Sequence, residues 1–374
     1  MRLRVSSGPV RVSVFGKSDL GRTREHNEDT FLVADLSIQN ASLQPEVRSH
    51  AVGPKGSLFM VADGMGGAVA GELASQMATD VIYRHLSTVW ATDGETSQDR
   101  FAYRMKEALE LANHRIFEYA REHPELRGMG TTATVAGVLG DGLWLAQIGD
   151  SRAYLARGGE VIQLTKDQSL MQRLVDAGEL TQEEADQSER RNIILQALGP
   201  DARVKVDLTH QTLRRGDTLV ICSDGLSSQV RREEIGELIE TSNGLADLCD
   251  ALIDLANGRG GPDNITVVVA RFEGEGLPDF QGAGGVGYHV YRLPDSATPT
   301  AERAVPAAPR DEVVSESSAE QPVVESLAPA EIVAQEDPEP PPEGFESRGA
   351  TGRPLLLALG LAVLAALLFY IAIR

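Results

Sequence analysis

Five short acidic motifs lie far apart in this chain of 374 residues. They contain Glu28-Asp29, Asp63-Gly64, Asp150, Asp224-Gly225 and Asp263-Asn264. Three of them follow apolar runs of β type, which are Leu58–Val61, Leu145–Ile148 and Leu219–Cys222. Carboxylates at the ends of buried strands repel one another, so a fold tolerates such a cluster when positive charge lies among them. Hard divalent cations take oxygen ligands, and the arrangement therefore predicts a two-metal hydrolase site.

The pair Asp63-Gly64 is the most informative of these motifs. Asp63 follows a strand-like run, and the glycine-rich stretch Gly64–Gly67 would let the backbone approach a ligand closely. The Asp63 carboxylate could bridge two cations while the Gly64 carbonyl supplies another oxygen. Asp-Gly is also a common turn pair, and Asp141-Gly142 is interpreted as part of a hairpin turn. The strand before Asp63 and the similar acids elsewhere favour the metal-site interpretation here.

The remaining motifs have ordinary alternatives. Asp224 shares the strand-then-glycine context of Asp63, whereas Asp263 alone would be interpreted as a turn or cap aspartate. Asp150 could be a hairpin acid paired with Arg152.

Three residues of the first motif bear on phosphate chemistry. Glu28 and Asp29 could be a solvated acidic pair, and Arg24 is ordinarily a surface arginine. Beside metal ions, however, the Arg24 guanidinium could hold a phosphate in bidentate fashion. Other chemistry is disfavoured, because no Gly-x-x-x-x-Gly-Lys-Ser/Thr loop occurs and the seven histidines show no ligand spacing for zinc.

Composition bounds the class of protein. Apolar residues make up 42% of the chain, enough for a sizeable core, and the formal net charge is −20. This charge disfavours nucleic acid as a partner, because a phosphate backbone needs a basic surface. The two cysteines, Cys222 and Cys249, imply neither a disulfide framework nor a cysteine zinc site. Residues 1–17 have no long apolar run, so no signal peptide is expected.

The elements that must position these acids lie between about residue 10 and residue 273, and the domain is placed at residues 12–273. The strand-like runs are Val10–Phe15, Leu58–Ala62, Thr132–Leu139, Leu143–Ile148, Ala153–Ala156, Thr218–Ser223 and Ile265–Phe272. Two long helical patterns, Glu72–His85 and Arg100–Glu122, place apolar residues on one side. Strands and helices each come in groups, which argues against a regular βαβ winding and for an antiparallel α+β fold.

The regions outside this domain differ in composition. Residues 1–11 are interpreted as an N-terminal arm. Residues 274–350 contain 15 acidic and 4 basic residues, a net charge of −11, with many prolines and no apolar period. This composition predicts a disordered acidic linker.

An apolar stretch of 19 uncharged residues, Leu355–Ile373, follows and is flanked by Arg353 and Arg374. As a helix it would be about 28 Å long, close to the thickness of the hydrocarbon core of a bilayer. A buried core helix is the alternative, but the stretch has no amphipathic side. We therefore expect a C-terminal transmembrane helix, with Arg348 and Arg353 favouring the cytoplasm for the preceding residues.

With these motifs in view, residues 12–272 resemble the metal-dependent protein phosphatases of type 2C, the PPM family, in its bacterial branch. The resemblance implies a four-layer α-β-β-α sandwich of two antiparallel sheets flanked by helices. It also implies a binuclear Mn²⁺ or Mg²⁺ site at one end. Asp63 would bridge both ions, and Gly64 would offer its carbonyl. Asp224 and Asp263 would bind the first ion.

The same resemblance assigns the other site residues. Glu28 would lie on the second ion's side, through water, and Asp29 would orient metal-bound water. Arg24 matches the phosphate-binding arginine, and Asp150 matches a ligand of a weaker third ion, shared with Asp224. The family's reaction is attack on phosphorus by a metal-activated water, without a covalent enzyme intermediate.

Three features set this chain apart within the family. Met65 stands where many eukaryotic members have a histidine proposed as the leaving-group acid, and methionine cannot donate a proton. Ser228 stands where many members have an acid, which makes it a weaker ligand for a third ion. Residues 165–191 correspond to the family's flap, a variable insertion near the active site, and Leu170–Ala177 within it has a helical pattern.

The resemblance implies hydrolysis of phosphoserine and phosphothreonine on proteins, opposing bacterial Ser/Thr kinases. Partners would be phosphorylated proteins, including the kinases or their substrates. Together with the apolar C-terminal stretch, this predicts a single-pass protein of the bacterial inner membrane with a cytoplasmic catalytic domain. Two alternatives stay open. One is a membrane-tethered pseudophosphatase that binds phosphoproteins without turnover, and the other is a regulatory phosphatase that acts on anti-sigma-antagonist proteins.

Overall fold

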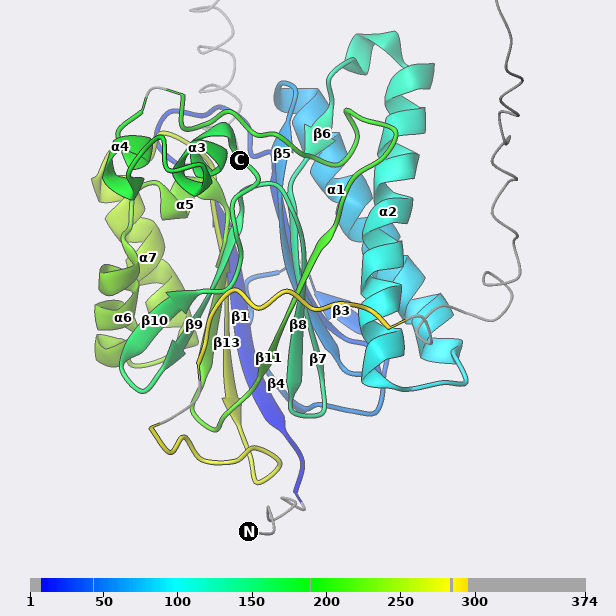
Figure 1. Cartoon of the computed structure of the whole chain (residues 1–374), viewed down its shortest axis with the longest axis vertical. Coiled ribbons are helices and arrows are strands. Elements are labelled where there is room, and N and C mark those ends of the chain that lie inside the picture. The colour runs from blue at the N-terminus through cyan, green and yellow to red at the C-terminus, as the bar shows by residue number, and fades with distance from the viewer. Residues whose placement is uncertain (1–7, 43, 189, 283–284, 295–374) are drawn as a thin grey trace, which may run out of the picture. The chain divides into compact units, whose positions relative to one another are not determined.

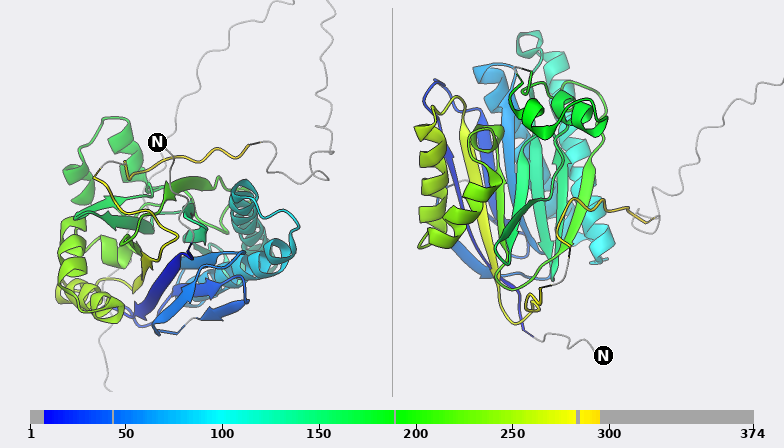
Figure 2. Two further views of the ribbon diagram at one scale, coloured as in Figure 1. Left: turned by 90° about the horizontal axis from the view of Figure 1, so that it is seen from below. Right: turned by 60° about the vertical axis from the view of Figure 1, so that its left-hand side comes forward.

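The computed structural model describes residues 8–42, 44–188, 190–282 and 285–294. In these residues two antiparallel sheets pack face to face, and helices cover the outer face of each (Figure 1). The view from below in Figure 2 shows the same order of layers, with both sheets enclosed between helices. The predicted α+β fold and its α-β-β-α order are therefore confirmed.

The strands of the first described sheet are, in spatial order, β10 (Glu160–Gln163), β9 (Arg152–Arg157), β12 (Thr218–Cys222), β13 (Ile265–Glu273), β1 (Arg11–Asp19) and β4 (Arg48–Ala51). Those of the second are β11 (Asp207–Thr212), β8 (Gly142–Ile148), β7 (Ala133–Leu139), β5 (Ser57–Met65), β2 (Asp29–Asp35) and β3 (Asn40–Ser42). A short strand, β6 (Gly130–Thr131), pairs with the last residues of β5.

Helices cover the two sheets in separate groups (Figure 1). Outside the second sheet lie α1 (Ala68–His85) and α2 (Gln98–Glu122), joined by a π-helical turn, Leu86–Trp90. Outside the first sheet lie α6 (Arg232–Thr241) and α7 (Leu245–Gly258). The shorter helical segments are the turn Pro124–Leu126, α3 (Leu170–Asp176), α4 (Gln182–Asp186) and α5 (Asp224–Ser227).

Alternation along the strands divides the core into three apolar layers. In β12, Val220 faces the helices while Ile221 faces the opposite sheet. In β5, Met60 packs toward α1 and α2 while Val61 packs between the sheets. Successive side chains of a strand point to opposite faces, and both faces are buried here. The central strands are therefore continuously apolar, which holds their ends in fixed positions.

The first part of the predicted linker belongs to the domain. We call residues 274–282 and 285–294 the C-terminal strap. Leu277 is fully buried in the core between the sheets. The Tyr291 N–H donates to the Leu208 carbonyl at 2.8 Å, and the Tyr291 ring packs edge-on against Trp144. Figure 1 shows the strap crossing β11 toward α2. The prediction of disorder from residue 274 is wrong for the strap. Leu277 and Tyr291 pack on the domain, and the backbone of the edge strand β11 hydrogen-bonds to the strap.

The ends of the predicted regions also shift. Val10 is buried and β1 begins at Arg11, so the domain starts within the predicted arm of residues 1–11. The predicted membrane span, Leu355–Ile373, lies outside the described residues. Within the residues that are described, no helix combines the length and the apolar character needed to cross a bilayer.

Leu277→Ala in the full chain tests whether the strap is part of the folded domain. Removing a fully buried leucine side chain leaves a cavity, so we expect the free energy of unfolding to fall by about 2–5 kcal/mol. Val290→Ala is the matched control, since Val290 is 60% exposed in the same strap, and it should change stability by less than about 0.5 kcal/mol. Urea titration measures both. Equal, negligible effects would show that the strap does not pack.

Candidate active site

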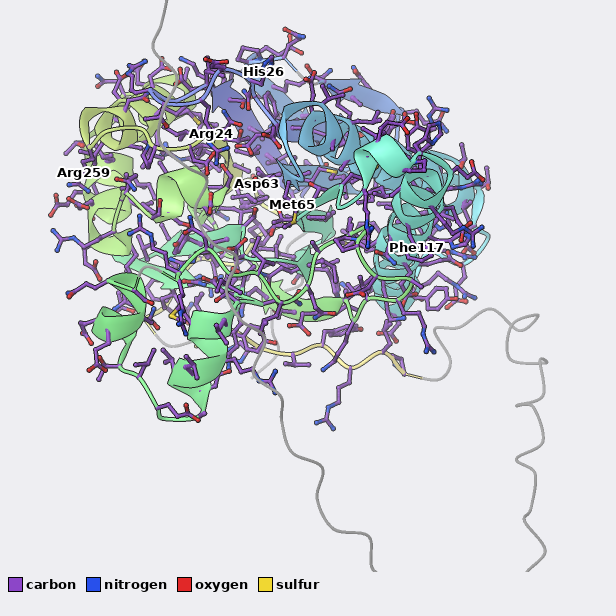
Figure 3. The ribbon with its side chains drawn as sticks, turned by 90° about the horizontal axis from the view of Figure 1, so that it is seen from above. Arg24, His26, Asp63, Met65, Phe117 and Arg259 are labelled. Atoms are coloured by element: carbon purple, nitrogen blue, oxygen red, sulfur yellow. The ribbon has the colours of Figure 1, made fainter. Side chains whose placement is uncertain are left out.

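The predicted acids come from five separate segments and meet at one end of the sandwich. Asp63 lies near the end of β5, and Asp29 begins β2 directly opposite it in register. Asp224 is the first residue of α5, just beyond β12. Asp150 lies in the turn between β8 and β9, and Asp263 in the loop before β13. Figure 3, seen from above, shows Asp63 between the two helix layers.

Burial and mutual repulsion raise the pKa of four of these carboxyls, those of Asp29, Asp63, Asp150 and Asp224. Burial raises the pKa of Asp29 to about 7 against two hydrogen bonds that lower it, and the charges of Asp224 and Asp263 add to the rise. Burial and the charge of Asp263 raise the pKa of Asp224 to about 6. For Asp63, burial and the charges of Asp29, Asp224 and Asp150 raise the pKa well above its ordinary value. The protein therefore concentrates negative charge here at a cost in stability.

Asp150 has an oxygen atom without a partner. The residue is 6% exposed, and its Oδ1 accepts no hydrogen bond within the described structure. Burial and the charges of Asp224 and Asp167 raise the pKa of Asp150 to about 8. Arg152 pairs with Asp167, to which its Nε and one terminal nitrogen donate at 3.0 and 2.7 Å. The alternative of a hairpin acid paired with Arg152 is therefore not supported.

Buried hydroxyl groups hold two of the acids in place. Ser223 Oγ donates to Asp29 Oδ2 at 2.7 Å. The Asp63 N–H donates to Thr132 Oγ1 at 3.0 Å, and Thr132 Oγ1 in turn is 2.7 Å from Ser151 Oγ. Sequence reasoning missed these three hydroxyls, although Ser151 and Ser223 are direct neighbours of predicted metal ligands.

Arg24 is the cation that reaches the acids from the solvent side. One of its terminal nitrogens lies 2.7 Å from Asp263 Oδ2, and the two side chains are 46% and 28% exposed. The charges of Glu28 and Asp63 also act on the guanidinium. Figure 3 shows Arg24 beside Asp63 at this end of the molecule. The predicted placement of Arg24 at an anion-binding position is therefore compatible with the structure.

Glycines allow the segments to approach closely around Glu28. The Gly64 N–H donates to the Glu28 carbonyl at 3.1 Å. A Cβ on Gly64 would come within 2.2 Å of the Gly71 carbonyl oxygen and 2.6 Å of the Glu28 carbonyl oxygen. A Cβ on Gly71 would come within 1.8 Å of Glu28 Oε2. Only glycine fits at Gly64, where the contacts are with backbone atoms, whereas a Cβ at Gly71 would displace the Glu28 carboxylate. The sequence had pointed to Gly64 but not to Gly71.

The donors gathered here suit hard divalent cations. The set consists of carboxylate oxygens, which Mg²⁺ and Mn²⁺ prefer as ligands. The unpartnered Oδ1 of Asp150 and the raised pKa values of Asp63 and Asp224 show negative charge that a cation would relieve. As the side chains stand, no three His, Cys, Asp or Glu residues in the described part of the chain are already arranged around one point to hold an ion. The donor chemistry fits, while protein donors such as Arg24 and Ser223 engage some of the carboxylates.

The flap is joined to the turn that carries Asp150. Gly149 N–H donates to Gln168 Oε1 at 2.9 Å, and the Gln168 N–H donates back to the Gly149 carbonyl at 3.0 Å. The helical pattern predicted at Leu170–Ala177 is confirmed by α3. Ser228, at the end of α5, accepts a hydrogen bond from the Gln229 side chain at 3.1 Å.

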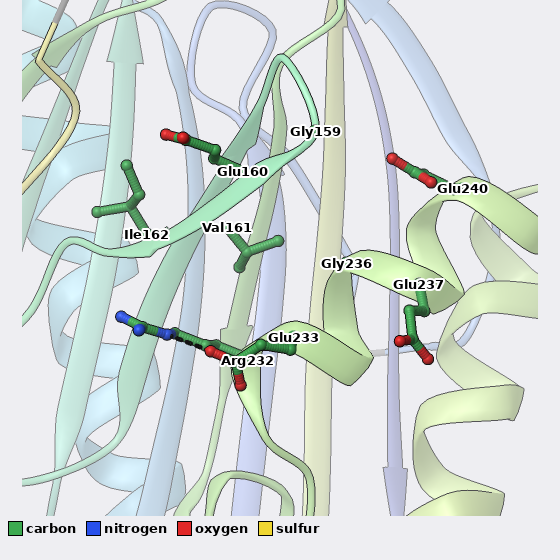
Figure 4. Close-up of a pocket in the computed structure, with 9 residues that line it drawn as sticks. All are labelled: Gly159, Glu160, Val161, Ile162, Arg232, Glu233, Gly236, Glu237 and Glu240. Carbon is green, nitrogen blue, oxygen red and sulfur yellow. Dashed lines mark hydrogen bonds and ion pairs between the residues drawn. The ribbon is translucent and has the colours of Figure 1, made fainter.

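A cavity of about 450 Å³ lies away from the acids, between β10 and α6 (Figure 4). Its lining includes Glu160, Glu233, Glu237 and Glu240. Arg232, the cation among its lining residues, is held by Glu233 at 2.7 Å. Such a lining repels phosphate, so this cavity is not a candidate phosphate site.

Comparisons with known proteins show the family of this chain. A family model described as protein phosphatase 2C matches residues 39–264. A serine/threonine phosphatase of Listeria innocua is 37% identical over 256 residues, which cover 68% of this chain and 94% of that protein. The serine/threonine phosphatase PstP/Ppp of Mycobacterium tuberculosis has a crystal structure that matches with a TM-score of 0.59 and 37% identity, over 70% of this chain and 99% of that one.

A further solved structure shows the catalytic domain of PstP in complex with two manganese ions. It is 36% identical with a TM-score of 0.57, and the match covers 71% of this chain and 99% of that one. The chain therefore belongs to the protein phosphatase 2C family. The resemblance noted from the motifs is confirmed, and with it the class of enzyme, a metal-dependent protein-serine/threonine phosphatase.

Without metal ions, the full chain should lose stability as pH rises from about 4 to about 8. Unfolded aspartates titrate near 3.8, whereas the folded pKa values of Asp224, Asp29 and Asp150 are about 6, 7 and 8. In this window the folded state binds more protons than the unfolded state, so the free energy of unfolding falls with rising pH. Urea unfolding in EDTA at several pH values measures the slope.

The control separates Asp150 from general charge effects. Asp150→Asn should reduce the fall in the free energy of unfolding between about pH 4 and pH 8 by an amount on the order of a few kcal/mol. Asp80→Asn, on the exposed side of α1, should leave the pH dependence of this free energy unchanged. Added Mn²⁺ should restore stability near pH 8. A free energy of unfolding that rises through this window in EDTA would contradict the arrangement of acids described here.

Proposed function

We propose that this chain hydrolyses phosphoserine and phosphothreonine esters on proteins with a binuclear Mn²⁺ or Mg²⁺ centre. The observation that carries the proposal is the meeting of Asp63, Asp224 and Asp263 beside the solvent-facing Arg24. Membership of the protein phosphatase 2C family and the two manganese ions of the related catalytic domain support it.

In this proposal the aspartates bind the cations and Arg24 binds the phosphate. Asp63, Asp224 and Asp263 would hold the two cations, with the Gly64 carbonyl as a further ligand, and Asp150 would contribute to a weaker third site. When bound, the cations supply an activated water and neutralise charge on the phosphoryl oxygens. Arg24 would exchange its ion pair with Asp263 for the substrate phosphate, which a guanidinium binds in bidentate fashion.

The two acids of the first motif act through hydrogen bonds. Asp29 has one carboxylate oxygen fixed by Ser223 at 2.7 Å, and its other oxygen would orient the attacking water. Glu28 would act through water on the second ion's side. Met65 has no proton to give to the leaving oxygen, so that proton would come from water.

Loss of Asp63 or Asp224 should abolish catalysis in the presence of Mn²⁺. We expect Asp63→Ala and Asp224→Ala to reduce kcat/KM by at least about 10²–10³-fold, because charge stabilisation of the transition state is usually the largest catalytic contribution. Hydrolysis of p-nitrophenyl phosphate and of a phosphothreonine peptide measures it. Asp247→Ala, on the exposed face of α7, is the control and should retain activity.

Other outcomes of this assay decide between the functions. Wild-type activity that persists in both site variants would reject the assigned centre. Tight phosphopeptide binding without turnover, with or without Mn²⁺, would identify a pseudophosphatase. Turnover restricted to anti-sigma-antagonist phosphoproteins would identify a regulatory phosphatase with the same chemistry.

We also propose that Leu355–Ile373 anchors the chain in the bacterial inner membrane with the catalytic domain in the cytoplasm. The support is the sequence itself, 19 uncharged residues between Arg353 and Arg374. Tethering raises the effective concentration of an enzyme near membrane-bound partners such as Ser/Thr kinases.

Fractionation of cells tests the anchor. The full chain should stay in the membrane pellet after carbonate extraction, because a spanning helix is not released by it, whereas a chain lacking residues 351–374 should be soluble. Full-length protein in the carbonate supernatant would contradict the proposal. The deletion should leave hydrolysis of p-nitrophenyl phosphate unchanged, since the acids lie in another region of the chain.

A further inference from the structure

The side chain of Asn264 has all its hydrogen-bonding groups committed to one loop. It is 4% exposed. Its Oδ1 accepts from the Glu28 N–H at 2.8 Å, and its Nδ2 donates to the carbonyls of Leu20 and His26, each at 3.0 Å. A carboxamide offers one acceptor oxygen and two N–H donors, so this side chain is fully used by the segment from Leu20 to Glu28.

That segment depends on polar contacts for its position. Residues 22–26 are exposed, so apolar burial contributes little to holding them. The Arg22 N–H donates to the Gly261 carbonyl at 2.8 Å, and Thr23 Oγ1 donates to the Pro262 carbonyl at 2.6 Å. At Gly21, where φ is 80°, a Cβ would come within 2.1 Å of the Asp263 carbonyl oxygen. The segment is thus hydrogen-bonded to the loop before β13. Asn264 contacts this segment before and after its exposed residues 22–26.

The tip of this segment carries Arg24. Asn264 fixes the backbone at His26 and Glu28 after the arginine and at Leu20 before it. A misplacement of about 1 Å in a substrate-positioning group can cost about 10²-fold in rate. The backbone on both sides of Arg24 is therefore held by a buried amide.

We propose that Asn264 is a positioning residue that sets the location of Arg24 for phosphate binding. The inference rests on the proposed function of the site. Asn264 is also the neighbour of Asp263, but the contact between them uses the Asn264 backbone N–H, which donates to Asp263 Oδ1 at 2.8 Å. Replacing the side chain leaves that backbone donor in place, so the contacts that are lost are those to the segment from Leu20 to Glu28, which carries Arg24.

A double-mutant cycle on the full chain with Mn²⁺ tests this route. Asn264→Ala should lower kcat/KM for a phosphothreonine peptide by about 10–100-fold. In the Arg24→Ala background the same change should cost no more than about 2-fold, because the residue it positions is absent. An equal fold-loss of kcat/KM from Asn264→Ala in both backgrounds would overturn the proposal. So would an Asn264→Ala variant that needs more Mn²⁺ for half-maximal activity, because that result would place the effect at Asp263.

Asn113→Ala is the matched control for removing a buried amide. Asn113 is 2% exposed on α2, accepts from the Gly199 N–H at 2.8 Å and donates to the Asp201 carbonyl at 3.0 Å. This variant should lose stability but keep its kcat/KM. Asn264→Asp provides a second variant of the same shape for the case in which Asn264→Ala fails to fold. It lacks both N–H donors and should show the same dependence on Arg24.

Hydrogen exchange of the full chain gives a readout that needs no catalysis. The Glu28 amide and its neighbours, in a peptide covering residues 20–28, should exchange faster in Asn264→Ala or Asn264→Asp than in the wild type. Asn113→Ala should leave this peptide unchanged. Unaltered exchange in both Asn264 variants would overturn the proposal. If the wild-type chain hydrolysed no phosphopeptide, the proposed function would fail while the exchange data still decided the role of Asn264.

Discussion

Repulsion among carboxylates is the constraint on which the rest of this structure depends. Five aspartates from distant segments share one end of the sandwich, and burial together with their neighbours' charges raises the pKa values of Asp29, Asp63, Asp150 and Asp224. Continuously apolar strands on both sides of the core supply the stability that offsets this concentration of charge. Buried hydroxyls hold the Asp29 carboxylate and the Asp63 backbone in place, and Gly64 lets the neighbouring segments approach closely.

The sequence was most informative where a single local pattern, such as an apolar run, helical spacing or a turn motif, decides the element. The apolar runs before Asp63 and Asp224 predicted β5 and β12, the helical spacing at 100–122 predicted α2, and Gly140-Asp141 forms the hairpin turn between β7 and β8 as expected. Helix α7 was missed although Leu245–Gly258 has helical spacing of apolar residues, and β2 was missed although Phe31–Ala34 is an apolar run. Strand β11 was missed because its polar residues interrupt the apolar pattern.

Contacts between distant segments could not be predicted from the sequence. The roles of Ser223, Thr132 and Gly71 depend on which segments meet, and no periodicity carries that information. The strap was predicted to be disordered for a related reason, because its apolar content is low. In the structure, Leu277 and Tyr291 pack against the apolar layers that the two sheets form. Motif resemblance pointed to the acids that meet at this end of the sandwich because it encodes the fold, whereas the supporting groups are visible only in three dimensions.

The contacts of Tyr291 determine where the strap ends on the domain. Tyr291 hydrogen-bonds to Asp99 near the beginning of α2, while the chain beyond the other end of that helix leads to β6, which pairs with Met65 near the acids. A helix of 25 residues is about 37 Å long. The strap is therefore anchored at Tyr291 about one helix length from the acids, at the opposite end of the domain.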